Sequence, residues 1–400
     1  MSELSYLEKL LDGVEVEWVP VSELFQIKNG YTPSKSKKEF WENGTIPWFR
    51  LEDVRVNGRE LNDSIQYINP LGVKGCLFPK NSIFMSTTAT IGEYALVRVP
   101  YLTNQQITNF SISEKFSEAV NIKYIFYMFY DFGKWCTENA NKSGGVSIIG
   151  LKKLSQYQFP IPCPDNPEKS LAIQSEIVRI LDKFTALTAE LTAELNMRKK
   201  QYNYYRDQLL SFKEGEVKWK TLGEITEINT GQKPSEILDK AATFDYINAG
   251  TSRSGYTTMS NCDGDTVTTP SRGQGGIGFV GYQKTPFWLG PLCYKIKSLN
   301  NEILINKFLF YTLQSRNRIL LSLKKEGGVP AVNKIDLAKL IIPLPSLDEQ
   351  KRIVSLLDKF DTLTNSITEG LPREIELRQK QYEYYRDLLF SFPKPETVSN

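Results

Sequence analysis

The side chains that most often perform catalysis in proteins are absent from this sequence or stand alone in it. None of its 400 residues is histidine, so Ser-His-Asp and Cys-His arrangements and histidine metal ligands are excluded. Its five cysteines are scattered, with no Cys-x-x-Cys pair to indicate zinc or a disulfide framework. They are Cys76, Cys136, Cys163, Cys262 and Cys293. We therefore expect no catalytic residue, no metal site and a cytoplasmic location.

Motifs for nucleotide and methyl-group chemistry are also missing. A phosphate-binding loop needs Gly-Lys followed by Ser or Thr, but Gly133-Lys134 is followed by Trp135. An amino-methyltransferase needs a Pro-Pro loop, and the sequence contains no Pro-Pro pair. The aromatic run Tyr124–Phe132 is far too short to span a bilayer. The sequence predicts a chain without cofactors of its own and without a membrane partner.

The elements that position the remaining residues are present twice. Residues 201–212 and 381–392 agree at nine of twelve positions. Further matches follow the same order in both halves. They are Ile177–Thr188 with Ile353–Thr364, Gly144–Val146 with Gly327–Val329, Pro160 and Pro162 with Pro343 and Pro345, and Gly30–Ser34 with Gly231–Ser235. Two units of this size are domains rather than the short repeats of a solenoid. The framework is shared, while the stretches between these motifs differ.

Each half ends in a long predicted helix. Ser346–Glu349 forms a capping box directly after two prolines. Apolar residues then follow at spacings of three and four, as in a coiled-coil seam, with a four-residue stutter near Leu191–Leu195 in the first helix. About 45 residues would make a rod of roughly 65 Å. Gly370-Leu371-Pro372 predicts a break in the second helix, with Pro372 restarting a segment.

The predicted fold class is α+β. Two pseudo-symmetric mixed α/β globules alternate with the two long helices, which we expect to pack antiparallel as a coiled coil. Strand-like runs such as residues 82–99 and a short aromatic helix near residues 121–132 support the mixed class. The predicted boundaries are residues 1–165 and 218–345 for the globules, 166–217 for the first helix with its linker, 346–392 for the second helix and 393–400 for a tail.

Charge is distributed unevenly between the two globules. The whole chain has 49 Lys and Arg against 46 Asp and Glu, which does not by itself indicate a nucleic-acid binder. Residues 218–345 hold 16 basic and 10 acidic residues, which suits a surface facing phosphates. Residues 1–165 hold 17 and 18, so this globule must cluster its basic residues locally if it binds DNA.

The sequence resembles the specificity subunits of type I restriction–modification enzymes. The resemblance rests on GYTPS and IPWFRLEDV within Gly30–Val54, on Gln174 and Gln350 at the helix junctions, and on both QYxYYRDxLxxF helix ends. It implies that the globules are target recognition domains, each reading one half of a split site in double-stranded DNA. It also implies that the helices set the spacing and dock two methyltransferase subunits, and that restriction subunits join that core. S-adenosylmethionine, ATP and magnesium would belong to these partners.

Candidate DNA-binding residues follow from side-chain chemistry and this resemblance. Amides can read adenine, Arg can read guanine, and Lys can contact phosphates. The candidates are Lys35, Lys37, Lys38, Arg50, Asn104, Gln105, Gln106, Lys233, Arg253, Arg272 and Gln274. The alternative for each is hydrogen bonding within a turn or a solvated loop. The Gly-rich run Ser271–Gly276 is interpreted as a hairpin that can lie on DNA rather than as a nucleotide site.

Candidate packing and docking residues lie at the two helix ends. They are Tyr202, Tyr205, Arg206, Leu209, Tyr382, Tyr385, Arg386 and Leu389. Their helical spacing favours packing between helices and docking of subunits over stacking on bases. The alternative function for the whole chain is a coiled-coil scaffold that holds two protein partners without touching DNA. The basic second globule and the unequal middle segments favour DNA binding over that scaffold.

Overall fold

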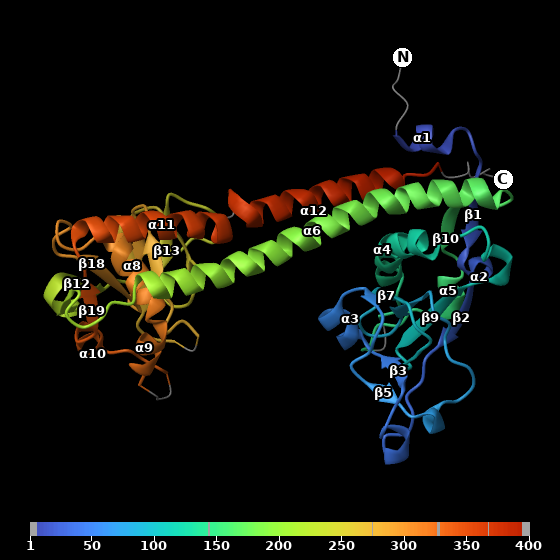
Figure 1. Cartoon of the computed structure of the whole chain (residues 1–400), viewed down its shortest axis with the longest axis horizontal. Coiled ribbons are helices and arrows are strands. Elements are labelled where there is room, and N and C mark those ends of the chain that lie inside the picture. The colour runs from blue at the N-terminus through green and yellow to red at the C-terminus, as the bar shows by residue number, and fades with distance from the viewer. Residues whose placement is uncertain (1–5, 143–144, 274, 326–328, 367, 394–400) are drawn as a thin grey trace. The chain divides into compact units, whose positions relative to one another are not determined.

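The computed structural model describes residues 6–142, 145–273, 275–325, 329–366 and 368–393 (Figure 1). The chain divides into two compact units. Unit 1 contains Met1–Thr188 and Arg378–Asn400, and unit 2 contains Ala189–Leu377. The long helix α6 (Pro167–Leu209) begins in unit 1 and ends in unit 2. Each unit therefore combines one globule with parts of both helical regions.

Unit 1 is built on a central sheet of five strands. In spatial order they are β2 (Phe25–Asn29), β9 (Ile107–Ile112), β6 (Ser82–Ser86), β7 (Tyr94–Val97) and β4 (Glu60–Leu61). Only the β4–β7 pair is parallel. Two smaller sheets complete the unit. These are β5 (Tyr67–Ile68), β3 (Ile46–Phe49) and β8 (Leu102–Thr103) in one, and β1 (Val16–Pro20) with β10 (Gln158–Pro162) in the other.

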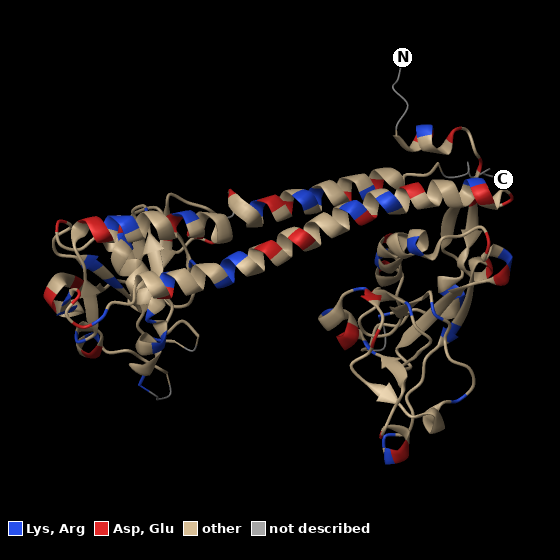
Figure 2. Ribbon diagram, viewed as in Figure 1, with Lys and Arg blue, Asp and Glu red and all other residues tan. Residues whose placement is uncertain are grey.

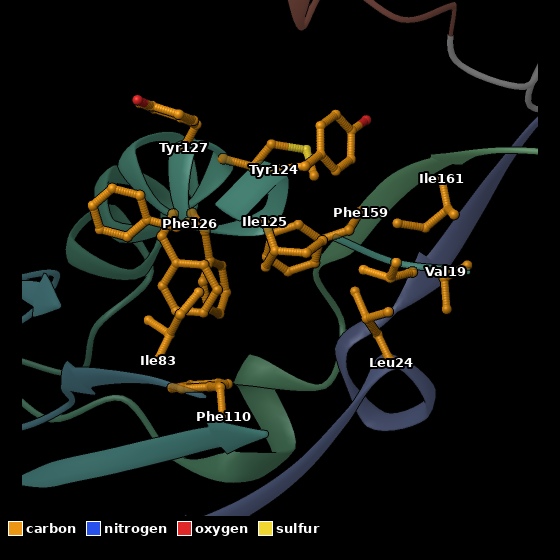
Figure 3. Packing of buried hydrophobic residues seen from close by; sticks show 14 of the residues in the cluster. Val19, Leu24, Ile83, Phe110, Tyr124, Ile125, Phe126, Tyr127, Phe159 and Ile161 are labelled. Atoms are coloured by element: carbon orange, nitrogen blue, oxygen red, sulfur yellow. The ribbon is translucent and has the colours of Figure 1, made fainter. Parts of the chain in front are cut away.

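The core of unit 1 is largely aromatic. Helix α4 (Ile122–Glu138) packs on the central sheet, and Figure 3 shows side chains from both filling the space between them. The Asn121 side chain caps this helix by accepting a hydrogen bond from the Lys123 backbone N–H, 2.9 Å away. Phe129 lies 5.3 Å from Phe110 in an edge-to-face arrangement. The predicted aromatic helix is therefore confirmed, and it is longer than expected.

Unit 2 repeats this strand order with one strand fewer in the central sheet. That sheet runs β12 (Thr226–Thr230), β18 (Cys293–Ser298), β15 (Thr266–Pro270) and β16 (Gly281–Gln283), all antiparallel. The smaller sheets are β14 (Gly255–Thr257), β13 (Phe244–Ile247) and β17 (Trp288–Leu289), and β11 (Lys218–Thr221) with β19 (Ile341–Leu344). Helix α8 (Asn306–Ser315) takes the place of α4. The duplicated α+β architecture predicted from the sequence is confirmed.

Short helices connect these elements. In unit 1 they are α1 (Tyr6–Leu11), α2 (Val21–Leu24), η1 (Lys38–Phe40), α3 (Leu51–Asn57), η2 (Pro70–Gly72), η3 (Glu114–Phe116) and α5 (Leu151–Leu154). In unit 2 they are α7 (Leu222–Ile225), α9 (Asn317–Ser322) and α10 (Lys334–Ala338). None of the helices in the described ranges is both long and apolar enough to cross a membrane.

The second helical region is broken, as predicted. Helix α11 (Leu347–Asn365) is capped by Ser346, whose hydroxyl accepts from the Glu349 backbone N–H at 3.4 Å. Helix α12 (Gly370–Leu389) then begins two residues earlier than Pro372. Gly370 has φ +79°, a conformation that glycine adopts without strain. Proline is tolerated in a first helical turn because its missing N–H would have no partner there.

Within each unit, the end of one helical region packs against the start of the other. In unit 1, Tyr385 of α12 stacks on Phe184 of α6 with ring centroids 5.2 Å apart. In unit 2, Tyr205 of α6 stacks on Phe360 of α11 at 5.8 Å. Both phenylalanines belong to the repeated Leu-Asp-Lys-Phe motif. In each unit, the end of a helix from one repeat therefore packs against the Leu-Asp-Lys-Phe motif of the other repeat.

Candidate nucleic-acid interface

Unit 1 contains an open cavity of about 770 Å³ that gathers residues from three separate segments. Its lining is Thr32, Lys35, Lys38, Trp41, Glu42, Trp48, Arg50, Gln66, Asn104, Gln105 and Gln106. Six of the seven DNA-binding candidates in the first half lie here. The seventh, Lys37, is not among the lining residues, and its ammonium lies over the Phe40 ring, 5.0 Å from the centroid.

Backbone hydrogen bonds hold two of these segments together. The Gly30 N–H donates to the Ile107 carbonyl oxygen and the Tyr31 N–H to that of Thr103, both at 2.9 Å. A Cβ on Gly30 would overlap Thr103, so only glycine permits this approach. Trp48 then ties β3 to the same loop by donating from Nε1 to the Tyr31 carbonyl oxygen, 3.2 Å away. The repeated Gly-x-x-Pro-Ser motif therefore builds one wall of the cavity.

Two tryptophans supply its apolar surface. Trp41 and Trp48 meet edge to face with centroids 5.1 Å apart. The Trp41 Nε1–H donates to the Ser34 carbonyl oxygen at 3.1 Å. Since both indole N–H groups are satisfied within the protein, the rings offer apolar contact rather than hydrogen bonds to a ligand.

Some polar groups of the cavity already have hydrogen-bond or ion-pair partners within the protein, and others have none among the described residues. Thr32 donates its hydroxyl to the Gln105 side-chain oxygen at 2.5 Å, and Asn104 accepts from the Gln106 backbone N–H at 3.0 Å. Arg50 is paired with Glu52 at 2.9 Å, while its buried Nε–H has no hydrogen-bond partner in the described part of the chain. The Gln106 side chain makes no hydrogen bond with a described residue, which leaves it available to a ligand.

The candidates in unit 2 are not gathered in this way. Arg253 lines a cavity of about 250 Å³ beside β13, β15 and β16, but its guanidinium is paired with Asp245 at 3.1 Å. The same group lies over the Tyr256 ring, 4.1 Å from the centroid. Lys233 and Arg272 are exposed outside that lining, and Gln274 lies outside the described residues. The three described candidates of this half, Lys233, Arg253 and Arg272, do not line one cavity together.

Five residues on the lining of the first cavity were not among the sequence candidates, namely Thr32, Trp41, Glu42, Trp48 and Gln66. Glu42 follows Lys38 by four residues, and the short helical turn η1 places both on the same lining. A helical turn after the lysine cluster was the available signal for it. Gln66 reaches the cavity only because β5 pairs antiparallel with β3, where Tyr67 lies opposite Pro47. No local sequence pattern indicates this strand pairing.

The helix junctions are built alike in both units. The Gln174 amide donates to the Ala119 carbonyl oxygen at 2.7 Å, and its oxygen accepts from the Asn121 N–H at 2.8 Å. Gln350 uses the same two groups with Ile303 and Ile305, both at 2.9 Å. Both glutamines are fully buried. A buried side chain that satisfies two loop backbone groups holds each long helix to its globule.

A tyrosine–aspartate pair follows each junction. The Tyr127 hydroxyl donates to Asp182, which also pairs with Lys123 at 2.9 Å. In unit 2, Tyr311 donates to Asp358 at 2.5 Å. Burial first, and then the neighbouring carboxylate, raises the pKa of both phenols well above the ordinary value. These groups connect α4 and α8 to the repeated Leu-Asp-Lys-Phe motif.

The candidate docking residues at the helix ends divide into buried and exposed groups. Tyr202 is buried and donates to the Gln314 side-chain oxygen at 2.9 Å, and Leu209 packs against the same core. The exposed group comprises Tyr205 and Tyr385 together with their neighbours Tyr204 and Tyr384. The sequence did not separate these two groups.

The arginine and the leucine of the second helix end are buried more deeply than those of the first. Arg386 is 4% exposed, lies over the Tyr130 ring at 3.7 Å, and pairs with Asp387 at 2.5 Å. Tyr382 is half-buried, and Leu389 is buried beside it in the core of unit 1. Arg206, by contrast, remains partly exposed beside Asp207. The last turns of α12 thus form part of the unit 1 core.

Comparison with known proteins agrees with the duplicated architecture. The family described as "Type I restriction modification DNA specificity domain" matches residues 13–198 and 214–377. The EcoprrI specificity subunit of Escherichia coli is 50% identical over 382 residues, covering 92% of this chain and 93% of that protein. The EcoR124I/EcoR124II specificity subunit of the same species is 42% identical over 436 residues, covering both chains fully.

Solved structures share the fold at low sequence identity. The type I S subunit from M. genitalium aligns with a TM-score of 0.58 and 18% identity, covering 96% of this chain and 98% of that one. A chain from a study of complex assembly in a type I R-M system aligns with a TM-score of 0.60 and 16% identity, covering 94% and 98%. With two matched recognition domains and relatives of this similarity, the chain belongs to the type I restriction enzyme specificity subunits, the non-catalytic recognition components of these systems.

Proposed function

We propose that each unit reads one half of a bipartite site in double-stranded DNA and that the cavity of unit 1 is the reading surface of the first half-site. The observation that carries this proposal is the gathering of four amide side chains, two lysines and Arg50 on one lining. Asn and Gln pair with adenine edges and Arg with guanine in the major groove, while lysines contact phosphates. The alternative, a scaffold that never touches DNA, has no need for such a gathering.

Different side chains on this lining are suited to affinity for DNA and to sequence specificity. Lys35 and Lys38 are exposed and have no ion-pair partner among the described residues, so they can neutralise phosphates on binding. The Gln106 amide is free to meet a base edge. Release of counterions from DNA makes such binding fall steeply with salt concentration, whereas base contacts set the preferred sequence.

We further propose that two methyltransferase subunits dock on the helix ends and that restriction subunits join that core. Tyr204 and Tyr384 support this because they occupy matching positions and are 61% and 65% exposed. Exposed tyrosines are typical of protein interfaces. S-adenosylmethionine, ATP and magnesium would be bound by those partner subunits. Two similar helix ends in one chain can hold two copies of one partner.

The long helices are proposed to set the spacing between the half-sites. Inserting a second copy of Thr-Ala-Glu-Leu after Leu195 adds about one helical turn, or roughly 6 Å of rise. DNA advances about 3.4 Å per base pair, so the unread spacer should lengthen by about one to two base pairs. Both half-site sequences should stay unchanged. An unchanged spacer with full activity would contradict this role of the helices.

The central experiment exchanges residues 218–345 for the equivalent segment of a relative with a different specificity. The exchanged chain is assembled with its methyltransferase subunits, and methylated sites are mapped across the host genome. We expect one half of the split motif to change and the other half to remain. A simultaneous change of both halves would contradict independent reading. Binding to random duplex that is insensitive to salt would favour the scaffold.

A further inference from the structure

Among the described residues that line the unit 1 cavity, Glu42 is the one with an acidic side chain. It shares that lining with Lys35, Lys38 and Arg50, yet it makes no ion pair within 4.0 Å and no side-chain hydrogen bond with any described residue. Its backbone is anchored on both sides. The Glu42 N–H donates to the Lys38 carbonyl oxygen at 3.0 Å, and the Asn69 amide donates to the Glu42 carbonyl oxygen at 3.2 Å.

A free carboxylate at this place is unfavourable unless a ligand provides a donor. Phosphates repel it, and an ionised carboxylate accepts hydrogen bonds but donates none. In the major groove, the donors that a carboxylate can meet are the exocyclic amino groups of cytosine and adenine. The adjacent lysines can neutralise nearby phosphates and so reduce the repulsion.

We propose that Glu42 is a specificity-determining residue of the first recognition domain. It accepts a hydrogen bond from the exocyclic amino group of one cytosine or adenine in the first half-site. This inference rests on the proposed function of the cavity. It adds a named residue that the amide and arginine candidates do not include, and it predicts which chemical group one base of the half-site must present.

Unit 2 shows what a carboxylate without this role looks like. Asp245 lines the smaller cavity there, but Arg253 neutralises it at 3.1 Å. An internally paired carboxylate has its acceptor capacity partly used within the protein. Glu42 keeps both oxygens available although three cations line the same cavity. The difference singles out Glu42 as a group held ready for a ligand.

The test uses the complete chain assembled with its methyltransferase subunits. E42A should relax the preference at a single position of the first half-site by roughly 5- to 150-fold, the range of one good base contact. The second half-site should be unchanged. E42Q identifies the base, because glutamine pairs well with adenine but has lost the carboxylate that favours cytosine. Retained preference in E42Q indicates adenine, and lost preference indicates cytosine.

E39Q is the matched control. Glu39 lies in η1, three residues before Glu42, and is exposed, but it is not among the residues that line the cavity. Its substitution removes the same charge, so any general gain in affinity for DNA should appear in both variants. If E42A kept the same base preference at every position of the first half-site, the inference would be overturned. If the unaltered complex itself lacked salt-dependent DNA binding, the proposed function would fail instead.

Discussion

The two recognition domains have the same backbone at one loop and opposite side-chain chemistry. In unit 1, Asn104-Gln105-Gln106 connects β8 to β9, and in unit 2, Gly290-Pro291-Leu292 connects β17 to β18. The chain just after β2 and just after β12 is held alike. The Tyr31 N–H donates to Thr103 at 2.9 Å, and the Gln232 N–H donates to Leu289 at 3.0 Å. Backbone hydrogen bonds preserve the loop, so its side chains can vary without altering the fold.

The cores of the two units differ in side-chain type, although the strand order is shared. Phe129 and Phe159 of unit 1 correspond to Leu313 and Ile342 of unit 2, and all four are fully buried. Strand order is retained although aromatic rings are replaced by aliphatic side chains. Cores tolerate such exchanges when their volume and pattern are kept. The buried glutamine and the tyrosine–aspartate pair of each helix junction are instead retained in both units.

The largest expected effect comes from removing the difference between the two loops. Replacing Asn104-Gln105-Gln106 by Gly-Pro-Leu should abolish reading of the first half-site while the domain stays folded. Loss of two base contacts at about 1–3 kcal/mol each amounts to as much as about 6 kcal/mol of discrimination. Methylation mapping with the assembled complex measures it. The reciprocal change in unit 2 is the control, and it should leave the first half-site intact.

The next effect concerns the aromatic core. F129A should lower the free energy of unfolding of unit 1 by about 3–5 kcal/mol because it leaves a large cavity. F129L, which introduces the residue of unit 2, should cost clearly less. Urea unfolding combined with hydrogen exchange locates the loss in unit 1. V56A, at a position 67% exposed, is the control. Equal costs for F129A and F129L would mean that the aromatic packing of unit 1 has no aliphatic equivalent.

A smaller and similar effect is expected in both units from the tyrosine–aspartate pairs. Y127F and Y311F should each cost about 1.5–3 kcal/mol, as for a hydrogen bond to a charged group. Because folding raises the pKa of both phenols, their contribution is fully present below about pH 10, the ordinary value for tyrosine, and declines as pH rises further.

Urea unfolding at pH 8, 10 and 11 tests this dependence. The unaltered chain should lose more stability than either variant over that interval. Y204F, which alters an exposed tyrosine, should follow the unaltered chain. A large loss of stability in only one of the two variants would show that the two pairs contribute unequally to the free energy of unfolding despite their matching geometry.

The smallest effect is expected from two glutamate–arginine pairs on α6 and α11, helices that carry charged residues of both signs (Figure 2). E349Q removes an exposed pair with Arg352 at 2.6 Å, and E176Q removes the pair with Arg179 at 2.5 Å. Exposed pairs of this kind contribute less than about 1 kcal/mol, and salt screens them. The paired arginines hold the pKa of both carboxyls below the ordinary value, so this contribution is lost as the solution is acidified.

Chemical unfolding at low and at high ionic strength measures this contribution. The two variants should differ from the unaltered chain less at high salt. A loss above about 2 kcal/mol in either one would contradict the assignment as a screened surface pair.

Prediction from sequence was most successful where the signal was local or repeated. The Ser346 cap, the break before Gly370 and the duplicated order of elements depend on neighbouring residues or on comparison of the two halves. It was partial at the candidate site. Lysines near residue 35 and amides near residue 105 were recognised by type, but Glu42 and Gln66 were not. Gln66 reaches the cavity through a strand pairing that no short pattern encodes, whereas Glu42 depends on the helical turn that follows the lysine cluster.

The sequence by itself determined the duplication, the long helices, the lack of histidine chemistry and the family. These follow from composition, helical periodicity and repeated motifs, which are properties of the chain. Tertiary structure alone decided which polar side chains share a surface. Tyr31 meets Thr103 through a backbone hydrogen bond at 2.9 Å, and Tyr202 meets Gln314, 112 residues away, at 2.9 Å. Such contacts arise from sheet pairing and core packing, whose energies depend on the whole fold rather than on neighbouring residues.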